Sequence, residues 1–282
     1  MTDGDQVRKV GALDALKGML SFFTIVRLNV GEREFGAMER SFWLAPVIGL
    51  LNGLVAFLAL VLLDVCDVPA MVQAAVAIAV VCAFSKFLHF DGLADFGDGM
   101  VVSSERREDH VRALKDSLIG AGALGTAVTV TLLTFACYAG LASFAAVPLA
   151  VVPAEVLAKN SMVAAAAFGE PGDGMASRQV SCTGAKSLIL SAVLSVALIA
   201  TTWLLVGPVA GWLGLHHPDI GPGLAVWMVA LPLLASVLVG RAMARAANRT
   251  FGFVNGDVLG ATNEVSRPFV LLAALIVLGL GL

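Results

Sequence analysis

The feature that most constrains this chain is a series of long apolar segments. A helix needs about 20 apolar residues to cross the roughly 30 Å hydrocarbon core of a bilayer. About seven segments approach this length. They cover residues 42–63, 70–88, 121–143, 144–168, 187–206, 223–240 and 268–282. The chain is 59% hydrophobic and only 14% charged, whereas soluble domains carry roughly 25% charged residues. The sequence therefore predicts an all-α, polytopic integral membrane helical bundle that forms one transmembrane domain over 1–282.

The N-terminal segment has a shorter and more polar pattern. Four apolar side chains recur at helical spacing within 12–30, and they are Leu13, Leu16, Leu20 and Phe23. This stretch is too short and too polar to span the bilayer, so we expect an interfacial or partly inserted helix that ends near Arg27. Residues 1–41 are therefore predicted to form a cytoplasmic or interfacial segment.

Basic residues lie on one side of the predicted topology. All 18 Lys and Arg residues except Lys86 and Lys159 fall in four segments. These segments are 1–41, 91–120, 169–186 and 241–267. Cytoplasmic loops of membrane proteins are enriched in Lys and Arg, so we expect a multi-pass protein of the cell (inner or plasma) membrane with a cytoplasmic N-terminus. The segment 241–267 is then a basic cytoplasmic loop.

Three aspartates follow the second apolar segment in helical phase. Asp91, Asp95 and Asp98 are four and three residues apart, which places them on one face of a helix. Clustered carboxylates repel one another unless a cation lies between them, and oxygen ligands suit Mg²⁺. We predict a Mg²⁺ site in a cytoplasmic acidic active-site loop over 89–120. A solvated acidic loop is the alternative.

Other charged residues around this stretch are candidates for chemistry. Arg112 and Lys115 lie about one helical turn apart and are expected to form a phosphate clamp that faces the carboxylates. Asp116 is a fourth metal ligand or the general base. His89 is a base or a hydrogen-bond donor, unless it is only an interfacial polar cap. The alternative for the basic pair is a juxtamembrane cluster that sets topology.

Charged residues inside the fourth apolar segment form a further candidate. Glu155 and Lys159 are four residues apart, which suits an ion pair, and ionisable residues within a span are usually functional. A purely structural pair is equally compatible with the pattern.

The last polar segment contains both basic and acidic candidates. A stripe of Arg241, Arg245 and Arg249 would bind a pyrophosphate or rest on anionic lipid. Asp257 follows a predicted tight turn, and Glu264 is seven residues later, so both can point into the site from one helical face.

The acidic stretch resembles the H-x-D-G-L-A-D-x-x-D-G signature of the cobalamin synthase family, the adenosylcobinamide-GDP ribazoletransferases. The matching residues are His89-Phe90-Asp91-Gly92-Leu93-Ala94-Asp95 and Asp98-Gly99. Two later blocks are also similar to the family. They are Lys115-Asp116-Ser117 with Ile119-Gly120, and Gly256-Asp257 with Leu259-Gly260-Ala261 and Asn263-Glu264.

The sequence departs from the family pattern at four positions. Leu118 and Lys159 stand where the family has Arg, Asn255 stands where Thr is common, and Asn29 replaces a proline. An Arg contact at 118 is therefore lost, while the carboxylates of the signature are kept.

The resemblance implies a specific phosphoryl transfer. A ribose hydroxyl of α-ribazole, or of its 5′-phosphate, attacks the cobinamide-linked phosphate of adenosylcobinamide-GDP, and GMP leaves. The product is adenosylcobalamin or its phosphate. Displacement at phosphorus depends on charge neutralisation and alignment, which Mg²⁺ on clustered carboxylates would supply.

The pattern and the resemblance together predict three sets of site residues. The catalytic set is His89, Lys115 and Asp116. The Mg²⁺ ligands are Asp91, Asp95 and Asp98. The substrate- and phosphate-binding set is Lys86, Arg112, Arg27, Lys159, Asp257 and Glu264. The expected partners are the two substrates and the lipid bilayer, not nucleic acid. Association into a homo-oligomer or with other cobalamin-assembly enzymes is left open.

Two other functions are compatible with parts of the pattern. A CDP-alcohol phosphotransferase of phospholipid synthesis also uses an Asp-rich segment at the inner membrane face, but its motif has Arg where Asp95 stands and further aspartates at other spacings. A cation-coupled transporter would carry polar groups near the bilayer midplane, often in two related halves. Here the charges gather at one face, and no half-repeat is visible.

Overall fold

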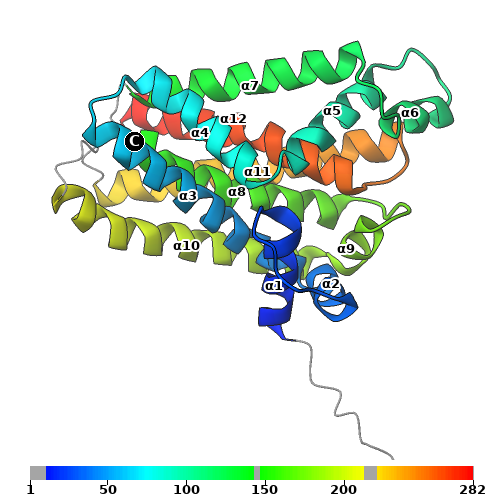
Figure 1. The fold of residues 1–282 in the computed structure, drawn as a ribbon, viewed down its shortest axis with the longest axis horizontal. Helices are drawn as coiled ribbons and strands as arrows, with labels where there is room; N and C mark the ends of the chain where they lie inside the picture. Colours follow the sequence, from blue (N-terminus) through cyan, green and yellow to red (C-terminus); the bar gives the residue numbers. More distant parts are fainter. Residues whose placement is uncertain (1–10, 143–146, 213–220, 282) are drawn as a thin grey trace, which may run out of the picture.

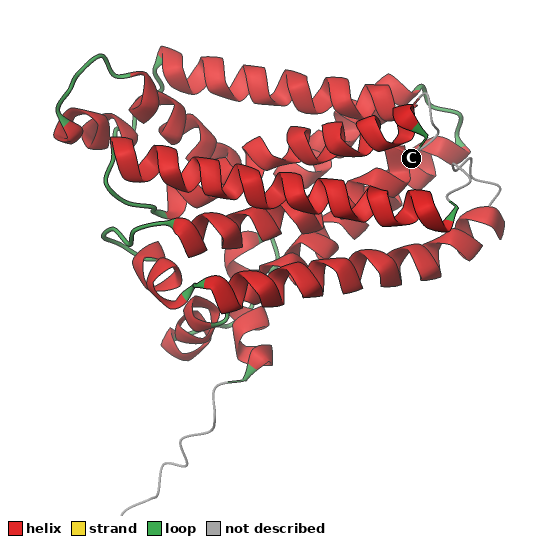
Figure 2. Ribbon diagram, turned by 180° about the vertical axis from the view of Figure 1, so that it is seen from behind, coloured by secondary structure: helices red, strands yellow, loops and turns green. Residues whose placement is uncertain are grey.

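The computed structural model describes residues 11–142, 147–212 and 221–281, and within them the chain is helical. Figure 1 shows the long helices running side by side, and Figure 2 shows the bundle from behind. The long helices are α3 (Ala45–Val65), α4 (Ala70–Phe84), α5 (Leu88–Val101), α7 (Ala121–Leu141), α8 (Val147–Phe168), α10 (Ala185–Trp212), α11 (Pro222–Thr250) and α12 (Gly256–Leu280). The short ones are α1 (Ala12–Phe23), α2 (Glu32–Arg40), a 3-10 turn (Phe42–Leu44), α6 (Arg107–Leu114) and α9 (Ala176–Cys182).

The described helices confirm the predicted class. Six of them are long and apolar enough to cross a membrane, and the bent pair α4–α5 raises the number to seven. The predicted junction between the third and fourth spans, at 143–144, lies outside the described residues.

Helix α8 is the centre of the bundle, and nearly all of its side chains are buried. Glycines on its neighbours allow this close packing. A Cβ added at Gly53 of α3 would lie 2.6 Å from the Cα of Val152, and one at Gly240 of α11 would clash with the carbonyl oxygen of Ser161. Small residues at such contacts let membrane helices approach at backbone distance, so α8 packs closely against both α3 and α11.

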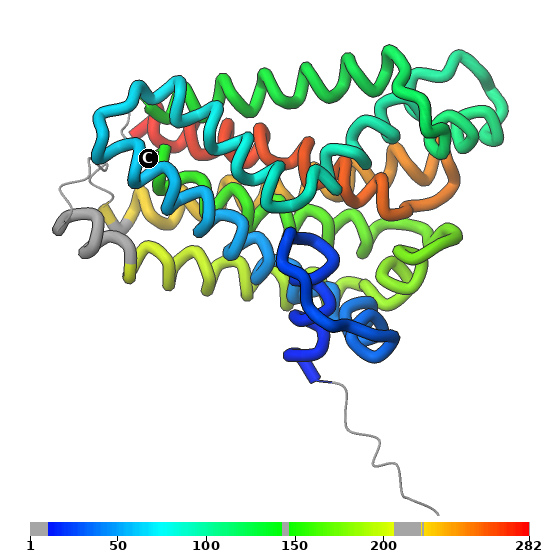
Figure 3. Tube along the Cα trace, viewed as in Figure 1, coloured from blue at the N-terminus to red at the C-terminus, as the bar shows by residue number. Residues whose placement is uncertain are grey.

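The second predicted span is broken, which corrects two expectations. Helix α4 has 15 residues, or about 22 Å, and ends at Phe84. After a break at 85–87 the chain bends by 94° into α5 (Figure 3). Lys86 and Phe87 both have φ of 56°, and the Phe87 N–H closes the end of α4 on the carbonyl of Cys82 at 2.8 Å. The acidic residues therefore lie on a packed helix, and the predicted loop over 89–120 is mostly helical.

The predicted basic loop over 241–267 is also wrong. Helix α11 continues to Thr250, and α12 begins at Gly256, so only five residues connect them. Asn255 starts α12 by accepting a hydrogen bond from the Val258 N–H at 3.1 Å. The predicted span 268–282 is the second part of this longer helix. The polar residues in the first part of α12 are buried against protein, so they lower its hydropathy without ending the helix. Hydropathy therefore placed the start of this span too late.

The N-terminal segment forms two short helices. Helix α1 ends at Phe23, earlier than the predicted end near Arg27, and buries Ala15, Met19 and Phe23 in the core. Its other side is tied to α2 by an ion pair of 2.7 Å between Asp14 and Arg33. The amphipathic pattern therefore packs α1 against the bundle.

The interior consists of two apolar clusters with a polar layer between them. On α8 one cluster includes Met162 and Val163, and the other includes Leu157. The buried polar side chains between them are Glu155, Lys159, Asn160 and Ser161 on α8 and Thr262, Asn263, Glu264, Ser266 and Arg267 on α12. Charged groups therefore also lie deep in the bundle, and the sequence-based argument that they gather at one face is incomplete.

Candidate active site

Three aspartates from two helices form an acidic cluster, which consists of Asp91, Asp95 and Asp257. Gly92 lets α5 and α12 approach, because a Cβ there would lie 2.8 Å from the carbonyl oxygen of Asp257. Asp95 is repelled most strongly by Asp257, then by Asp91, then by Asp98. The sequence analysis placed Asp257 among phosphate-binding residues, whereas the structure brings it to the carboxylates.

Asp98 has a different environment from the acidic cluster. Its two carboxylate oxygens accept hydrogen bonds from the backbone N–H groups of Gly120 and Ala123, at 2.7 and 2.8 Å. These donors lie at the start of α7, where backbone N–H groups lack partners within the helix. Asp98 thus caps α7 and fixes the end of the 115–120 turn to α5.

The predicted Mg²⁺ site remains a prediction. In the part of the chain that the structure describes, no group of three or more His, Cys, Asp or Glu side chains is arranged to hold a metal ion. The donor chemistry nevertheless fits. Among described residues no hydrogen bond or ion pair involves the carboxylates of Asp91 and Asp95, and Asp257 accepts one hydrogen bond, from Asn255 at 2.7 Å. Three repelling carboxylates with free oxygens suit a hard divalent cation.

His89 is buried beside the acidic cluster. Only 1% of its surface is exposed, so the alternative of an interfacial cap is wrong. Its ring stacks on Phe23, with centroids 5.6 Å apart. Neither ring nitrogen has a hydrogen-bond partner within the described residues. A buried polar group without a partner is rare, which singles out His89 as a group that can bind a ligand.

A partly open cavity of about 150 Å³ is lined by His89, and we call it the inner cavity. Asp91, Asp257 and Gln179 also line it. Gln179 of α9 is 4% exposed, and its amide nitrogen lacks a partner among described residues. Sequence reasoning missed Gln179, because a single polar residue in a short helix has no distinctive spacing.

A separate open groove of about 570 Å³ lies between α6 and the end of α11, and we call it the outer groove. Its lining includes Arg107, Arg112, Lys115, Asp116, Phe251 and Phe253. Lys115 is close enough to Asp257 to attract its carboxylate, as the predicted clamp requires. The Arg112 side chain is 78% exposed and lies 3.9 Å from Asp109. Asp116 is exposed and accepts a hydrogen bond from the Leu118 N–H at 3.0 Å.

Helix α6 is anchored beside the outer groove by Asp109 and His110. Asp109 accepts hydrogen bonds from the Ser104 hydroxyl at 2.7 Å and from Arg106 at 3.0 Å. The bond from Ser104 lowers the pKa of Asp109 most, and the bond from Arg106 lowers it further. The two ring nitrogens of His110 lie 2.8 Å from the carbonyl oxygens of Gly99 and Ser104. These contacts fix the helix that carries Arg107 and Arg112.

Two predicted phosphate ligands lie away from both cavities. Lys86 is at the break between α4 and α5, where its ammonium donates to the carbonyl of Ser21 at 3.4 Å. Arg27 is exposed beyond the end of α1 and forms no hydrogen bond or ion pair with described residues. Neither residue lines the inner cavity or the outer groove, and their substrate contacts stay predictions.

Lys159 and Glu264 belong to the polar layer. The Lys159 ammonium donates to Asn263 at 2.7 Å, and the Asn263 amide donates to Glu264 at 3.0 Å. Glu155 pairs with Arg267, so the predicted Glu155–Lys159 pair is wrong. Arg267 also pairs with Glu264. Neither Lys159 nor Glu264 lines the inner cavity or the outer groove, and the sequence analysis missed Arg267 because it assigned that residue to a loop.

The basic stripe on α11 is exposed along the helix. Arg241 lies over the ring of Phe168, 5.2 Å from its centroid, and Arg249 lines a separate open surface groove with Glu105 and His110. Both expected partners, a pyrophosphate and anionic lipid, suit this exposed stripe.

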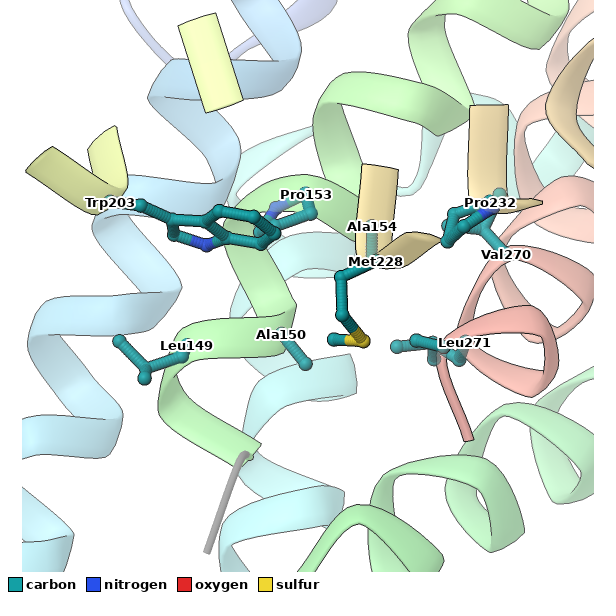
Figure 4. A pocket seen from close by; sticks show the side chains of 10 residues that line it. Leu149, Ala150, Pro153, Ala154, Trp203, Met228, Pro232, Val270 and Leu271 are labelled. Atoms are coloured by element: carbon teal, nitrogen blue, oxygen red, sulfur yellow. The ribbon is translucent and has the colours of Figure 1, made fainter. Parts of the chain in front are cut away.

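A further small cavity lies at the opposite end of the interior. It has a volume of about 30 Å³ and an apolar lining that includes Trp203, Met228 and Leu271. Figure 4 shows Trp203 beside Pro153, with Met228 facing Leu271. The lining contains no ionisable side chain, so this cavity offers nothing for phosphoryl transfer.

Comparison with known proteins gives one consistent family. Residues 15–275 match the family model described as cobalamin-5-phosphate synthase. An adenosylcobinamide-GDP ribazoletransferase of Halorubrum lacusprofundi is 37% identical over 276 residues, covering 94% of this chain and 97% of that protein. Its counterpart in Methanocella arvoryzae is 33% identical over 273 residues, covering 95% of this chain and 96% of that protein. No solved structure matches.

Proposed function

Because this chain belongs to the cobalamin-5-phosphate synthase family, we propose that it transfers adenosylcobinamide phosphate from adenosylcobinamide-GDP to α-ribazole or its 5′-phosphate. Membership of the family makes the chain a membrane transferase of cobalamin biosynthesis. Our proposal adds the identity of its two substrates. A ribose hydroxyl oxygen forms the new bond to the cobinamide-linked phosphorus. The phosphoanhydride bond breaks, and GMP leaves with the electron pair.

One observation carries this proposal. Asp257 lines the inner cavity and is attracted by Lys115 of the outer groove, so this pair of charges connects the two spaces. A bimolecular phosphoryl transfer needs room for an acceptor on one side of the reacting phosphorus and for a leaving group on the other. The two spaces offer that arrangement.

Different residues of the site have different roles in this transfer. Asp91, Asp95 and Asp257 would hold Mg²⁺, which supplies charge neutralisation for the diphosphate. Lys115 and Arg112 bind non-bridging phosphate oxygens. His89 takes the proton of the attacking hydroxyl, because it is buried in the inner cavity with both ring nitrogens free of described partners. We favour His89 over Asp116, which is exposed and already bonded within its turn.

A transfer assay tests the proposal. Full-length protein in detergent receives adenosylcobinamide-GDP, α-ribazole and Mg²⁺, and cobalamin and GMP are quantified with and without a chelator. We expect equimolar products that the chelator abolishes. Formation of neither product by folded protein, together with release of CMP from a CDP-alcohol reaction mixture, would favour the phospholipid-synthesis alternative.

We also propose that the site faces the cytoplasm from the plasma membrane. The distribution of Lys and Arg supports this orientation. Two cysteines are exposed, Cys66 directly after α3 and Cys182 at the end of α9. The turn from α3 to α4 and helix α9 lie toward opposite ends of the bundle (Figure 1). A membrane-impermeant maleimide applied to intact cells should label Cys66 and leave Cys182 unlabelled. Labelling of Cys182 alone would reverse the orientation.

A further inference from the structure

The inner cavity has unsatisfied polar groups from two different helices. His89 lies on α5, and Gln179 lies on α9. Both side chains are at least nine-tenths buried, and the His89 ring nitrogens and the Gln179 amide nitrogen have no partner among described residues. Leaving such groups unpaired costs free energy, so a ligand that bonds to both is indicated.

The remaining walls define the shape and polarity of that ligand. Phe22, Phe23, Met162 and Met175 contribute aromatic and thioether surface. Such surfaces suit a flat, largely apolar ring system. The acids lie at the α5 and α12 side of the cavity, beside His89, whereas Gln179 comes from α9. A bound molecule therefore meets an amide donor from α9 and the reacting groups from α5 and α12.

We propose that the inner cavity binds the benzimidazole base of the acceptor nucleoside, with Gln179 donating a hydrogen bond to the unsubstituted imine nitrogen of the ring. This assignment rests on the proposed function and extends it to the recognition of the acceptor. The ribose then points toward His89 and the acidic cluster. A benzimidazole riboside has one ring acceptor, which the single amide donor matches.

The guanine base of the donor does not fit this polarity. Guanine presents several donors and acceptors, and a mostly apolar cavity would leave them unpaired. The outer groove supplies cations for a diphosphate and the rings of Phe251 and Phe253 for a base. With the acceptor in the inner cavity and GMP in the outer groove, the attacking and leaving groups would come from two separate spaces, one lined by Asp91 and Asp257 and the other by Lys115.

A paired change in protein and ligand tests the proposal. In wild-type protein in nanodiscs, replacing α-ribazole by its indole riboside analogue, which has C–H in place of the imine nitrogen, should weaken binding roughly 10-fold. In Gln179→Met, α-ribazole should bind roughly 10-fold more weakly than to wild type. The indole analogue should bind Gln179→Met as strongly as it binds wild type. Binding of adenosylcobinamide-GDP should stay within about twofold. Calorimetry measures all three ligands.

Gln73→Met is the matched control. Gln73 is a buried amide of α4 that bonds to Asp64 and the carbonyl of Val68, away from the inner cavity. This variant should retain the full difference between α-ribazole and its indole analogue. A difference that persists in Gln179→Met, or a Gln179→Met defect in adenosylcobinamide-GDP binding, overturns the assignment.

The wild-type transfer assay separates this inference from the proposed function. If wild-type protein forms cobalamin and Gln179→Met discriminates between the two ribosides as wild type does, only the assignment of the cavity fails. If folded wild-type protein binds neither substrate and forms no product, the proposed function fails as well.

Discussion

The guanidinium of Arg267 lies 2.5 Å from a carboxylate oxygen of Glu155, and both side chains are buried between α12 and α8. Arg267 also bonds to Glu264. Replacing Arg267 by Met would leave two carboxylates in the interior without their cation. We expect a loss of about 3–5 kcal/mol of stability, measured as a lower Tm in detergent. Arg178→Met is the control, because its pair with Glu39 is at the surface and should matter little. Equal Tm values for the two variants would contradict a structural role for the buried pair.

Asp95 and Asp98 should respond differently to substitution. Asp95→Asn removes a carboxylate from a repelling cluster, so we expect the Tm to hold or rise while transfer activity falls at least 100-fold. In wild-type protein Mg²⁺ should raise the Tm, and in Asp95→Asn this shift should shrink. Retained activity in Asp95→Asn would show that the metal site lies elsewhere.

Asp98→Ala is expected to act on folding. It leaves the N–H groups of Gly120 and Ala123 without their acceptor, which should lower stability by about 1–3 kcal/mol. Thermal unfolding checks this. An unchanged Tm together with lost activity would instead return Asp98 to the predicted set of metal ligands.

His89→Gln tests the proton acceptor. A general base contributes about 10²- to 10⁴-fold to rate, so kcat should fall by that factor, while binding of adenosylcobinamide-GDP is preserved. The pH profile of kcat should also lose its acidic limb. If kcat stays within about threefold of wild type, Asp116 becomes the candidate, and Asp116→Asn is the next variant to measure.

The anchor of α6 predicts a pH dependence of stability. The pKa of Asp109 is lowered in the folded protein by its bonds to Ser104 and Arg106. Because its pKa is lowered on folding, Asp109 stabilises the fold at any pH above its unfolded pKa, which is ordinarily 3.8. This stabilisation is lost as the pH falls through the folded pKa. The Tm of Asp109→Asn should be below that of wild type at pH 7, and the difference should narrow at low pH. If the difference in Tm between Asp109→Asn and wild type were the same at every pH, protonation of Asp109 would not be linked to folding.

The break between α4 and α5 predicts a stabilising substitution. Phe87 has φ of 56°, and 53% of its surface is exposed. This conformation costs a non-glycine residue about 1–2 kcal/mol, so Phe87→Gly should raise the Tm modestly. Phe90→Gly, at a regular position of α5, should lower it. A fall in Tm for both variants would mean that the Phe87 side chain contributes more than its backbone strain.

Apolar length and charge asymmetry predicted most of the bundle from the sequence. The spans over 121–141 and 147–168 lie close to their predicted bounds, because apolar residues predominate along each helix. The phase of Asp91 and Asp95 also predicted that they share a helical face, which α5 provides.

The errors arose where a polar side chain is buried by protein. Asn263, Glu264 and Arg267 are polar in sequence but face α8 or one another. Hydropathy does not distinguish a residue that faces water from one with a buried partner. The sequence misassigned Asp257 and gave no sign of Gln179 for a related reason, because only the packing of α12 on α5, and of α9 on α2 and α8, brings them to the cavity beside His89.

The early end of α4 has a consequence for side reactions. At about 22 Å, α4 alone is shorter than the roughly 30 Å hydrocarbon layer, and the chain turns by 94° directly after it, so we expect the bend and the start of α5 to lie below the lipid surface. Water is the abundant competing nucleophile for any phosphoanhydride. With the proposed substrates, a recessed reaction centre would favour attack by a sugar alcohol over hydrolysis, and breakdown of the activated corrinoid should be slow while no acceptor is bound.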